Sequence, residues 1–321
     1  AIAAATAIIL SSSALVSSPA TTRDGGDDWV VSEQRYRVAG DVRLLLFWVS
    51  SDQVGSARIT WSAEEDTGRA ALSLLIGSDP KRAPRRVNEW GYVREETHGD
   101  SATVVGMRTA TDADSPEEAD AKRAKTANVG LLCSRIDGTA AQSWTTTLRI
   151  GQDATYRQVR PVLHQIAADT KWTEVQTTRP SEVSAGFLGA LNRMLRATAD
   201  SARGGGAIAP TPSSAYFYKD AIYDLAIRRS ERVARVRMRS GTIENAVRSE
   251  FAVTNRKTRS LSRFWIVYGT DGALAGVPLR AGYQPKWWLK IELELDDRID
   301  APADPAVDES TRLRLNELCQ R

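Results

Sequence analysis

The chain has 321 residues, a hydrophobic content of 42%, a charged content of 26% and a formal net charge of +3. This length allows two domains of ordinary size, and so small a net charge gives no reason to expect a nucleic acid partner. With two cysteines and two histidines, the chain lacks the ligand sets of common zinc and haem motifs. We therefore expect no metal site, no cofactor and no catalytic residues.

The first twenty residues, AIAAATAIILSSSALVSSPA, carry no charge, and the first ionisable side chain is Arg23. Openings of this kind are typical of signal peptides, signal anchors and membrane-docked termini. A helix over residues 1–16 would rise about 24 Å, slightly less than a ~30 Å hydrocarbon core. We expect a retained membrane-docked helix, with a cleaved signal peptide or an ordinary buried helix as alternatives. Its predicted contacts are Ile8, Ile9, Leu10 and Leu15.

Short strands are predicted after a polar linker that ends at residue 28. Residues 42–49, VRLLLFWV, have the continuous apolar pattern of a strand buried on both faces. Alternating segments follow at 57–62, 102–109 and 144–150, which is typical of half-exposed strands in a sandwich. Residues 112–125 are predicted to form a charged, mobile loop.

The middle of the chain has helical spacing. Apolar residues recur on one face from Tyr156 to Ile166, and a second helix is predicted from Pro180 to about Ala202. The Gly-, Pro- and Ser-rich segment 204–214 is typical of a linker.

Strands return after the linker, and the clearest is Leu289–Leu295, in which leucine and isoleucine alternate with charged residues. The chain ends in an acidic stretch with a short predicted helix over 310–320. The sequence predicts a mainly β protein with a helical middle: two β-sandwich-like domains plus an N-terminal apolar helix. The predicted units are an anchor and linker (1–28), a first β domain (29–152), a helical connector (153–205), a second β domain (206–300) and an acidic tail (301–321).

The two cysteines, Cys133 and Cys319, leave two alternatives open. In an oxidising compartment they can pair and tie the C-terminal tail to the first domain. Otherwise both are unpaired, with Cys133 buried in the apolar run VGLLC.

Two features are candidates for contacts with partners or membranes. Arg235, Arg237 and Arg239 alternate along a predicted strand and form a basic stripe, which suits lipid phosphates or an acidic protein surface. Its alternative is an ordinary solvated face. The adjacent Trp287 and Trp288 should point to opposite sides of a strand, one into the core and one outward. An exposed tryptophan suits a partner surface, a sugar or a membrane interface. The alternative is that both tryptophans pack in the core under a loop.

Catalytic alternatives rest on carboxylates, since neither histidine lies in a recognisable catalytic motif. Glu64, Glu65 and Asp66 crowd one predicted turn, and Glu95 and Glu96 crowd another. Paired carboxylates at a suitable separation serve glycosidases. Turns and solvated surfaces also collect such residues, and this is the simpler interpretation.

Three segments resemble uncharacterised envelope proteins of high-GC environmental bacteria: LLLFWVSSDQVGSARITW (44–61), LLIGSDPKRAPRRVNEWGYV (74–93) and FWIVYGTDGALAGVPLRAGYQPKWWLKIELELDD (264–297). The chain also looks like an accessory, pigment-free subunit of a bacterial photosynthetic reaction centre–light-harvesting complex. The resemblance implies a membrane-docked terminus and a folded body that bridges other chains. The apolar segment has no histidine to ligate a chlorophyll magnesium, so an antenna polypeptide is not expected.

Together these features predict a non-catalytic, membrane-associated accessory subunit, with a periplasmic body anchored at the inner membrane. It would contact other proteins of a membrane complex, and lipid, through the N-terminal segment and the basic stripe. The alternative is an extracytoplasmic carbohydrate-binding protein or a carboxylate-dependent glycoside hydrolase.

Overall fold

The structure is a computed structural model that describes residues 21–23, 29–44, 47–64, 66–109, 127–151, 153–203, 208 and 213–320. The predicted anchor contacts Ile8, Ile9, Leu10 and Leu15 lie outside the described residues, as does the predicted charged loop over 112–125. None of the helices in the described part combines the length and apolar character that are needed to cross a membrane.

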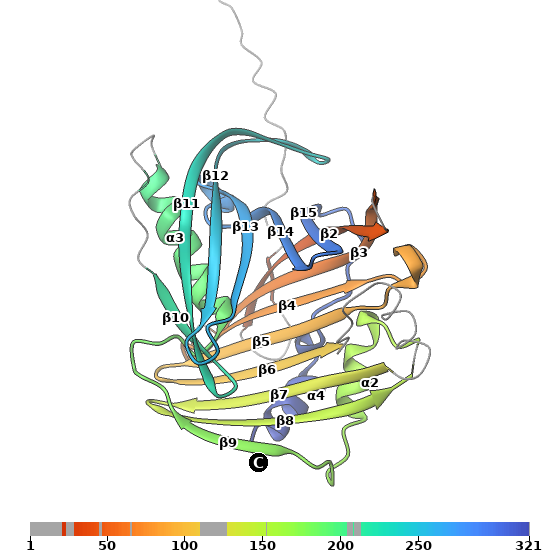
Figure 1. Cartoon of the computed structure of the whole chain (residues 1–321). Coiled ribbons are helices and arrows are strands. Elements are labelled where there is room, and N and C mark those ends of the chain that lie inside the picture. Colours follow the sequence, from red (N-terminus) through yellow and green to blue (C-terminus); the bar gives the residue numbers. More distant parts are fainter. Residues whose placement is uncertain are drawn as a thin grey trace, which may run out of the picture.

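Strands make up most of the described chain, which confirms the prediction of a mainly β protein (Figure 1). The strands are β1 Thr21–Arg23, β2 Trp29–Leu44, β3 Phe47–Glu64, β4 Ala70–Ser78, β5 Trp90–His98, β6 Ser101–Thr109, β7 Ala127–Asp137, β8 Ala140–Ile150, β9 Thr173–Thr178, β10 Ser214–Tyr218, β11 Ala221–Met238, β12 Gly241–Asn255, β13 Leu261–Gly269, β14 Pro278–Lys286 and β15 Leu289–Leu295. The helices are η1 Pro84–Arg86, η2 Tyr156–Gln158, α2 Val159–His164, α3 Phe187–Ala202, η4 Gly272–Leu274, η5 Pro305–Val307 and α4 Glu309–Leu318.

All the strands belong to one antiparallel sheet, in the order β10-β11-β12-β13-β14-β15-β2-β3-β4-β5-β6-β7-β8-β9, with β1 paired to β2. The two predicted β regions are joined because β15 pairs with β2, Leu295 opposite Tyr36. The sheet is strongly bent, so that β10–β13 stand across β4–β9 (Figure 1). A division into two domains at the predicted boundaries stays a prediction.

One face of β4–β8, called the outer face below, is covered by helices. Leu75, Tyr92 and Met107 are cross-strand neighbours on this face. They pack in one core with residues of α2 and α4, including Leu163 and Leu315. Burying these side chains follows from strict alternation along each strand.

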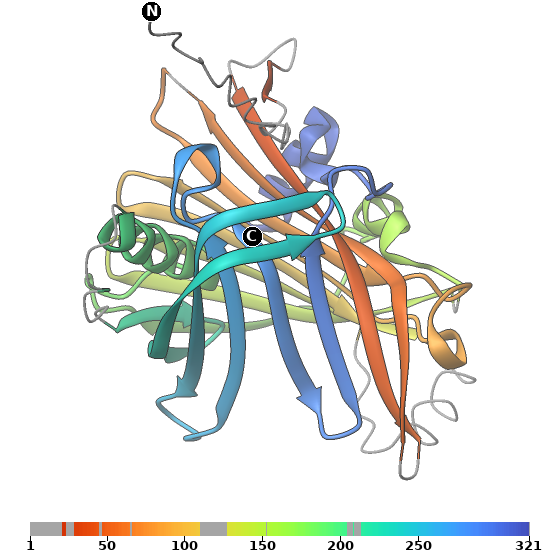
Figure 2. The ribbon, with the colours of Figure 1, turned by 90° about the horizontal axis from the view of Figure 1, so that it is seen from above.

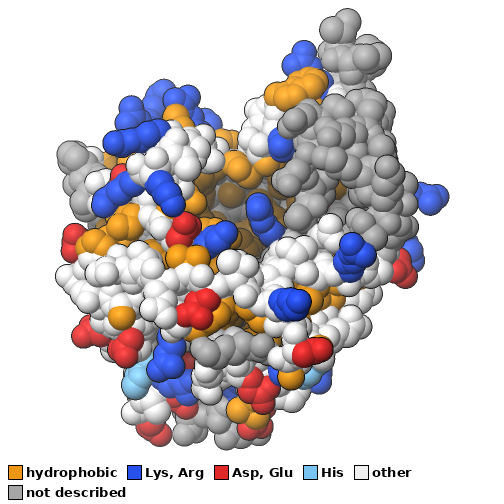
Figure 3. Space-filling model, turned by 60° about the horizontal axis from the view of Figure 1, so that its bottom comes forward, with side chains coloured by type: hydrophobic (Ala, Val, Ile, Leu, Met, Phe, Trp, Pro, Cys, Tyr) orange, Lys and Arg blue, Asp and Glu red, His pale blue; other side chains and the backbone are white. Residues whose placement is uncertain are grey.

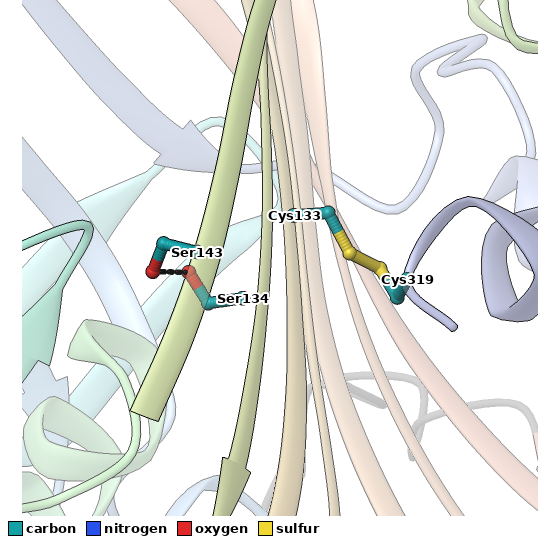
Figure 4. The surroundings of a disulfide bond; sticks show 4 residues. All are labelled: Cys133, Ser134, Ser143 and Cys319. Atoms are coloured by element: carbon teal, nitrogen blue, oxygen red, sulfur yellow. Dashed lines mark hydrogen bonds between the residues drawn. A yellow bond between two sulfur atoms is a disulfide. The ribbon is translucent and has the colours of Figure 1, made fainter. Parts of the chain in front are cut away.

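A disulfide joins Cys133 of β7 to Cys319 at the end of α4, which selects the paired alternative (Figure 4). Figure 4 shows Cys133 and the next residue, Ser134, on opposite sides of β7. The predicted acidic tail thus contains a packed helix fixed to the sheet.

Buried polar contacts hold the segment between β15 and α4 against the outer face. Asp296 accepts a hydrogen bond from Arg37 at 2.6 Å, and the carbonyl of Ala301 accepts one from Arg58 at 2.5 Å. Asp304 is 4% exposed and accepts a hydrogen bond from the Tyr92 hydroxyl at 3.0 Å. Since buried carboxylates need such partners, these contacts fix where the segment lies.

The opposite face, called the inner face below, is partly covered by α3. Met194 and Leu195 of this helix pack with Phe251 and Ile266 of the β12–β13 half of the sheet. The helix also contacts β4, so it lies between the two halves of the bent sheet. The rest of the inner face is left for the site described below.

Two sequence predictions are corrected. Residues 42–49 do not form one buried strand, because Val42 pairs with Val49 across the β2–β3 hairpin and Val49 is 39% exposed. The second helix begins at Phe187 after Gly186, and not at Pro180. Residues 180–186 instead lie against β10 through the Ser184–Tyr216 bridge.

Candidate functional site

The inner face of β4–β8 forms the floor of a trough between the two halves of the sheet. Two adjoining cavities of about 720 and 460 Å³ make up the trough, and they share Ile76, Gly91 and Arg108 in their linings. Figure 3 shows the molecule hollowed, with hydrophobic side chains in the floor and Lys and Arg side chains beside it. Volumes of this size are usual for small-molecule sites.

The floor is apolar because each strand points one set of alternate side chains to this face. Leu74 lies beside Val93, and Ile76 lies beside Gly91. These side chains are half-buried, unlike their outer-face neighbours such as Tyr92, which is 2% exposed. Further apolar side chains line the second cavity: Val38, Val42, Val54, Leu289 and Ile291.

Three glycines deepen the floor. Gly91, Gly106 and Gly130 line the first cavity on consecutive strands β5, β6 and β7. A Cβ atom at any of them would meet no atom closer than 3.6 Å. A small side chain would therefore fit at each of these positions. Because glycine has none, the cavity extends down to the backbone of the sheet.

Cationic side chains gather around the first cavity. Its lining includes Arg108, Lys171 and Lys219 and, among the described lining residues, no carboxylate. Lys219 is placed by the β10–β11 turn, whose carbonyl at this residue accepts a hydrogen bond from the Ser143 hydroxyl at 2.7 Å. The second cavity adds Lys286 and one carboxylate, Glu89, which accepts a hydrogen bond from Thr109 at 2.8 Å.

Glu95 connects β5 to α3 on the inner face. It is 4% exposed, and its carboxylate accepts hydrogen bonds from the backbone N–H groups of Leu188 at 2.6 Å and Gly189 at 2.8 Å. Burial raises the pKa of Glu95, while these two hydrogen bonds act in the opposite direction. An acceptor at a helix N-terminus satisfies amides that lack partners in the helix, so Glu95 holds α3 in place.

Glu95 and Glu96, the adjacent pair considered for glycosidase chemistry, lie in β5 and not in a turn, and they do not face each other at this site. Glu96 points to the face opposite Glu95 and accepts hydrogen bonds from Arg69 at 2.6 Å and Arg94 at 3.3 Å. Glu64 lies 4.0 Å from the same Arg69. Glycoside hydrolysis requires two carboxylates on either side of one bond, and Glu95 and Glu96 cannot provide this arrangement.

One tryptophan of the pair points outward and one is buried, but both lie in the β14–β15 turn and not on a strand, which corrects the predicted reason for the split. Trp287 is 58% exposed, whereas Trp288 is 6% exposed and packs against Val42. In the β14–β15 turn, Trp288 lines the second cavity and Trp287 points outward. A contact of Trp287 with a partner or membrane stays a prediction.

The basic stripe lies at the tip of the β11–β12 hairpin, and part of its charge is balanced. Arg235 lies 3.4 Å from Glu244, and Arg239 lies 2.5 Å from Asp52 of β3. Arg237 is exposed. The opposite face of this segment buries Val236 and Met238 against the sheet, together with Leu279.

Apart from Trp288, the trough residues were not among the candidates predicted from the sequence. Arg108 and Lys219 come from segments more than a hundred residues apart, and only the bend of the sheet brings them to one cavity. The available signal was glycine inside apolar strand patterns, at Gly91, Gly106 and Gly130, since such glycines often mark close approach of a ligand or backbone.

No family model, curated protein or solved structure matches this chain.

Proposed function

We propose that the protein is a non-catalytic binding protein that holds the apolar chain of an anionic amphiphile, such as a long-chain fatty acid, in the trough. The observation that carries the proposal is the lining of the first cavity, where an apolar floor is bordered by Arg108, Lys171 and Lys219. An apolar floor favours a hydrocarbon chain, and three cations in the lining of the first cavity favour a negative head group.

The shape of the site also supports a chain-like ligand. The two cavities adjoin at Ile76 and continue along the sheet past Ile291. A compact ligand would need only one of them, whereas a flexible chain can occupy both. The membrane-associated setting predicted from the sequence fits such a ligand, and the accessory-subunit role stays a prediction beside it.

The test is displacement of a fluorescent apolar probe by saturated carboxylates of increasing length. Each methylene buried contributes about 0.8 kcal/mol, so affinity should rise about fourfold per methylene until the trough is full. Matched primary alcohols should bind more weakly than the acids, and Arg108→Gln should reduce this difference. Affinity independent of chain length would overturn the proposal.

A pair of variants separates the trough from other apolar surface. Ile76→Glu places a charge where both cavities meet and should abolish probe binding. Leu313→Glu makes the same kind of change on α4, where the side chain is 56% exposed, and should bind as the original protein does. Circular dichroism of both variants verifies the fold, and Val93→Trp fills the floor without adding charge if Ile76→Glu unfolds.

A further inference from the structure

The first cavity has a polar end at the last two strands of the sheet. Its lining there includes Thr145 and Thr147 of β8 and Thr173 of β9. No hydrogen bond joins these three hydroxyl groups to another group in the described part of the chain. Each hydroxyl can therefore donate a hydrogen bond to a ligand in the cavity. The apolar floor thus ends in a wall of hydroxyl groups.

One row of cross-strand neighbours, called the Gly106 row below, crosses this end of the floor. It consists of Gly106 of β6, Leu132 of β7, Thr145 of β8 and Thr173 of β9, each paired with the next. Because Gly106 has no side chain, the row leaves space above β6. A ligand group in this space would have the threonine hydroxyls on the side of β8 and β9.

Arg108 lies on one side of this space. It is two residues from Gly106 along β6, about 7 Å away on the same face. Its neighbours on both adjacent strands are glycines, Gly91 and Gly130, so no cross-strand side chain confines the guanidinium group. Arg108 is exposed and forms no ion pair with a described residue. Lys171, which precedes β9, lines the cavity on the same side.

Lys219 lies on the other side of the Gly106 row. Its carbonyl accepts the hydrogen bond from Ser143 at 2.7 Å, and Ser143 is two residues from Thr145 in the direction away from Arg108. The lysine belongs to the half of the sheet whose strands β13–β15 cross over β5–β8 in Figure 2. The bend of the sheet therefore places one cation on each side of the row, in the lining of one cavity.

The backbone at Lys219 supports a role for its side chain. Lys219 and Asp220 form the two-residue turn between the paired residues Tyr218 and Ala221. The φ angle of Lys219 is 61°, in the left-handed region, and glycine is the preferred residue at such a turn position. A lysine there costs stability, and residues held in this region cluster at functional sites. The strain at Lys219 is thus independent support for contact between its ammonium group and a ligand.

Four carboxylates lie near these cations in the sequence or in space: Glu89, Asp169, Glu174 and Asp220. Three of them have other partners. Glu89 accepts a hydrogen bond from Thr109 at 2.8 Å, Glu174 accepts one from Gln176 at 2.8 Å, and Asp220 lies 3.4 Å from Lys257. Asp169 is exposed and precedes Lys171 by two residues. None of the four lines the first cavity, so its donors have no carboxylate acceptor among the described lining residues.

We propose that the amphiphile in the trough carries a phosphate monoester head group, bound above the Gly106 row between Arg108 and Lys219. This inference rests on the proposed function and specifies its ligand. A phosphate monoester has three terminal oxygens and a charge near −2 at neutral pH. It can therefore accept hydrogen bonds from cations on both sides and from the threonine wall together, whereas a carboxylate has only two oxygens. The alkyl chain would run over Val93 and Ile76 into the second cavity.

The test compares head groups on one alkyl chain, in the probe assay described above and with the full chain. At about pH 7.5, decyl phosphate should bind about tenfold more tightly than decanoate, because one additional charge-assisted hydrogen bond corresponds to about that factor. At about pH 5, below the second pKa of a phosphate monoester near 6, the affinity of decyl phosphate should approach that of decyl sulfate. Decyl sulfate stays a monoanion, so it reports any effect of pH on the protein itself.

Matched variants locate the head group. Lys219→Gly should weaken decyl phosphate binding about tenfold, while urea unfolding should show equal or higher stability because glycine adopts a left-handed φ without strain. Arg259→Gly is the control: Arg259 has a φ of 60° in the β12–β13 turn and lines neither cavity, so binding should not change. Thr145→Val keeps the side-chain shape without the hydroxyl and should weaken phosphate binding by about threefold to tenfold.

Three results would overturn the inference: equal affinity for decyl phosphate and decanoate, unchanged phosphate binding in Lys219→Gly, or displacement of the probe by inorganic phosphate at the concentrations at which decyl phosphate acts. The last result would assign the cations to free phosphate. If carboxylate affinity still rises with chain length, the trough proposal stands while the head-group inference fails. If chain length has no effect, the trough proposal itself fails, so the two failures are distinguishable.

Discussion

Replacing both cysteines by alanine tests how strongly the C-terminal helix depends on its covalent link. Cys133 and Cys319 are 186 positions apart, and the loop-closure entropy for a link of this length corresponds to about 5 kcal/mol of unfolding free energy. Both side chains are nearly fully buried, at 1% and 3% exposure, so alanine keeps the site apolar. We expect the doubly substituted protein to unfold at a much lower urea concentration.

The measurement is equilibrium urea unfolding of the oxidised protein, the reduced protein and the alanine variant. The two forms without the bond should agree with each other and lose several kcal/mol relative to the oxidised form. Hydrogen exchange should accelerate first in Glu309–Leu318, because the disulfide holds this helix to β7. If removing the disulfide lowers the unfolding free energy by less than about 1 kcal/mol, the argument that the bond stabilises the protein by restricting the unfolded chain is refuted.

Four further substitutions probe the structure around the trough. Burial raises the pKa of Glu95, so the folded chain binds a proton at this carboxyl group more tightly than the unfolded chain does. Proton binding at Glu95 therefore stabilises the fold below the ordinary carboxyl pKa, and this contribution is lost as the pH rises through the raised pKa of the folded state. Urea unfolding between about pH 4 and 7 should therefore show that the unfolding free energy of Glu95→Gln depends less on pH than that of the original protein. The same pH dependence in both proteins would contradict this. A Cβ atom at Gly77 would lie 2.4 Å from the Tyr156 ring, so Gly77→Ala should lower the unfolding free energy by about 1–3 kcal/mol. A Cβ atom at Gly91 would meet no atom closer than 3.6 Å, so Gly91→Ala should change the unfolding free energy by less than about 0.5 kcal/mol. Asp304→Asn removes one of the two carboxylates that lie beside the buried Arg94, the other being Glu96. This substitution should lower the unfolding free energy in urea by about 1–3 kcal/mol, and a variant as stable as the original protein would contradict the prediction.

Strands could be predicted from the sequence because the alternation of apolar and polar residues is a local pattern. The predicted strand Leu289–Leu295 coincides with β15. Its apolar face could not be assigned to a closed core or an open trough from the pattern alone, since both environments select the same residues. Ile291 is only half-buried and lines the second cavity.

The pairing of β15 with β2 was not accessible, because it depends on contacts between residues about 250 positions apart, such as Leu295 and Tyr36. The role of Glu95 was hidden for a related reason. In the sequence it is one of two adjacent glutamates, and only the position of α3 shows that it accepts hydrogen bonds from Leu188 and Gly189.

The unequal covering of the two faces connects the fold to the proposed binding role. On the outer face, the C-terminal segment supplies Asp296 and Asp304 as polar contacts and α4 as apolar cover. On the inner face α3 covers only one part, because Glu95 fixes its N-terminus beside β5. The remaining apolar floor around Ile76 has no protein cover in the described part of the chain. Exposed apolar surface of this extent is unfavourable in water, and an amphiphile in the trough would remove it from solvent.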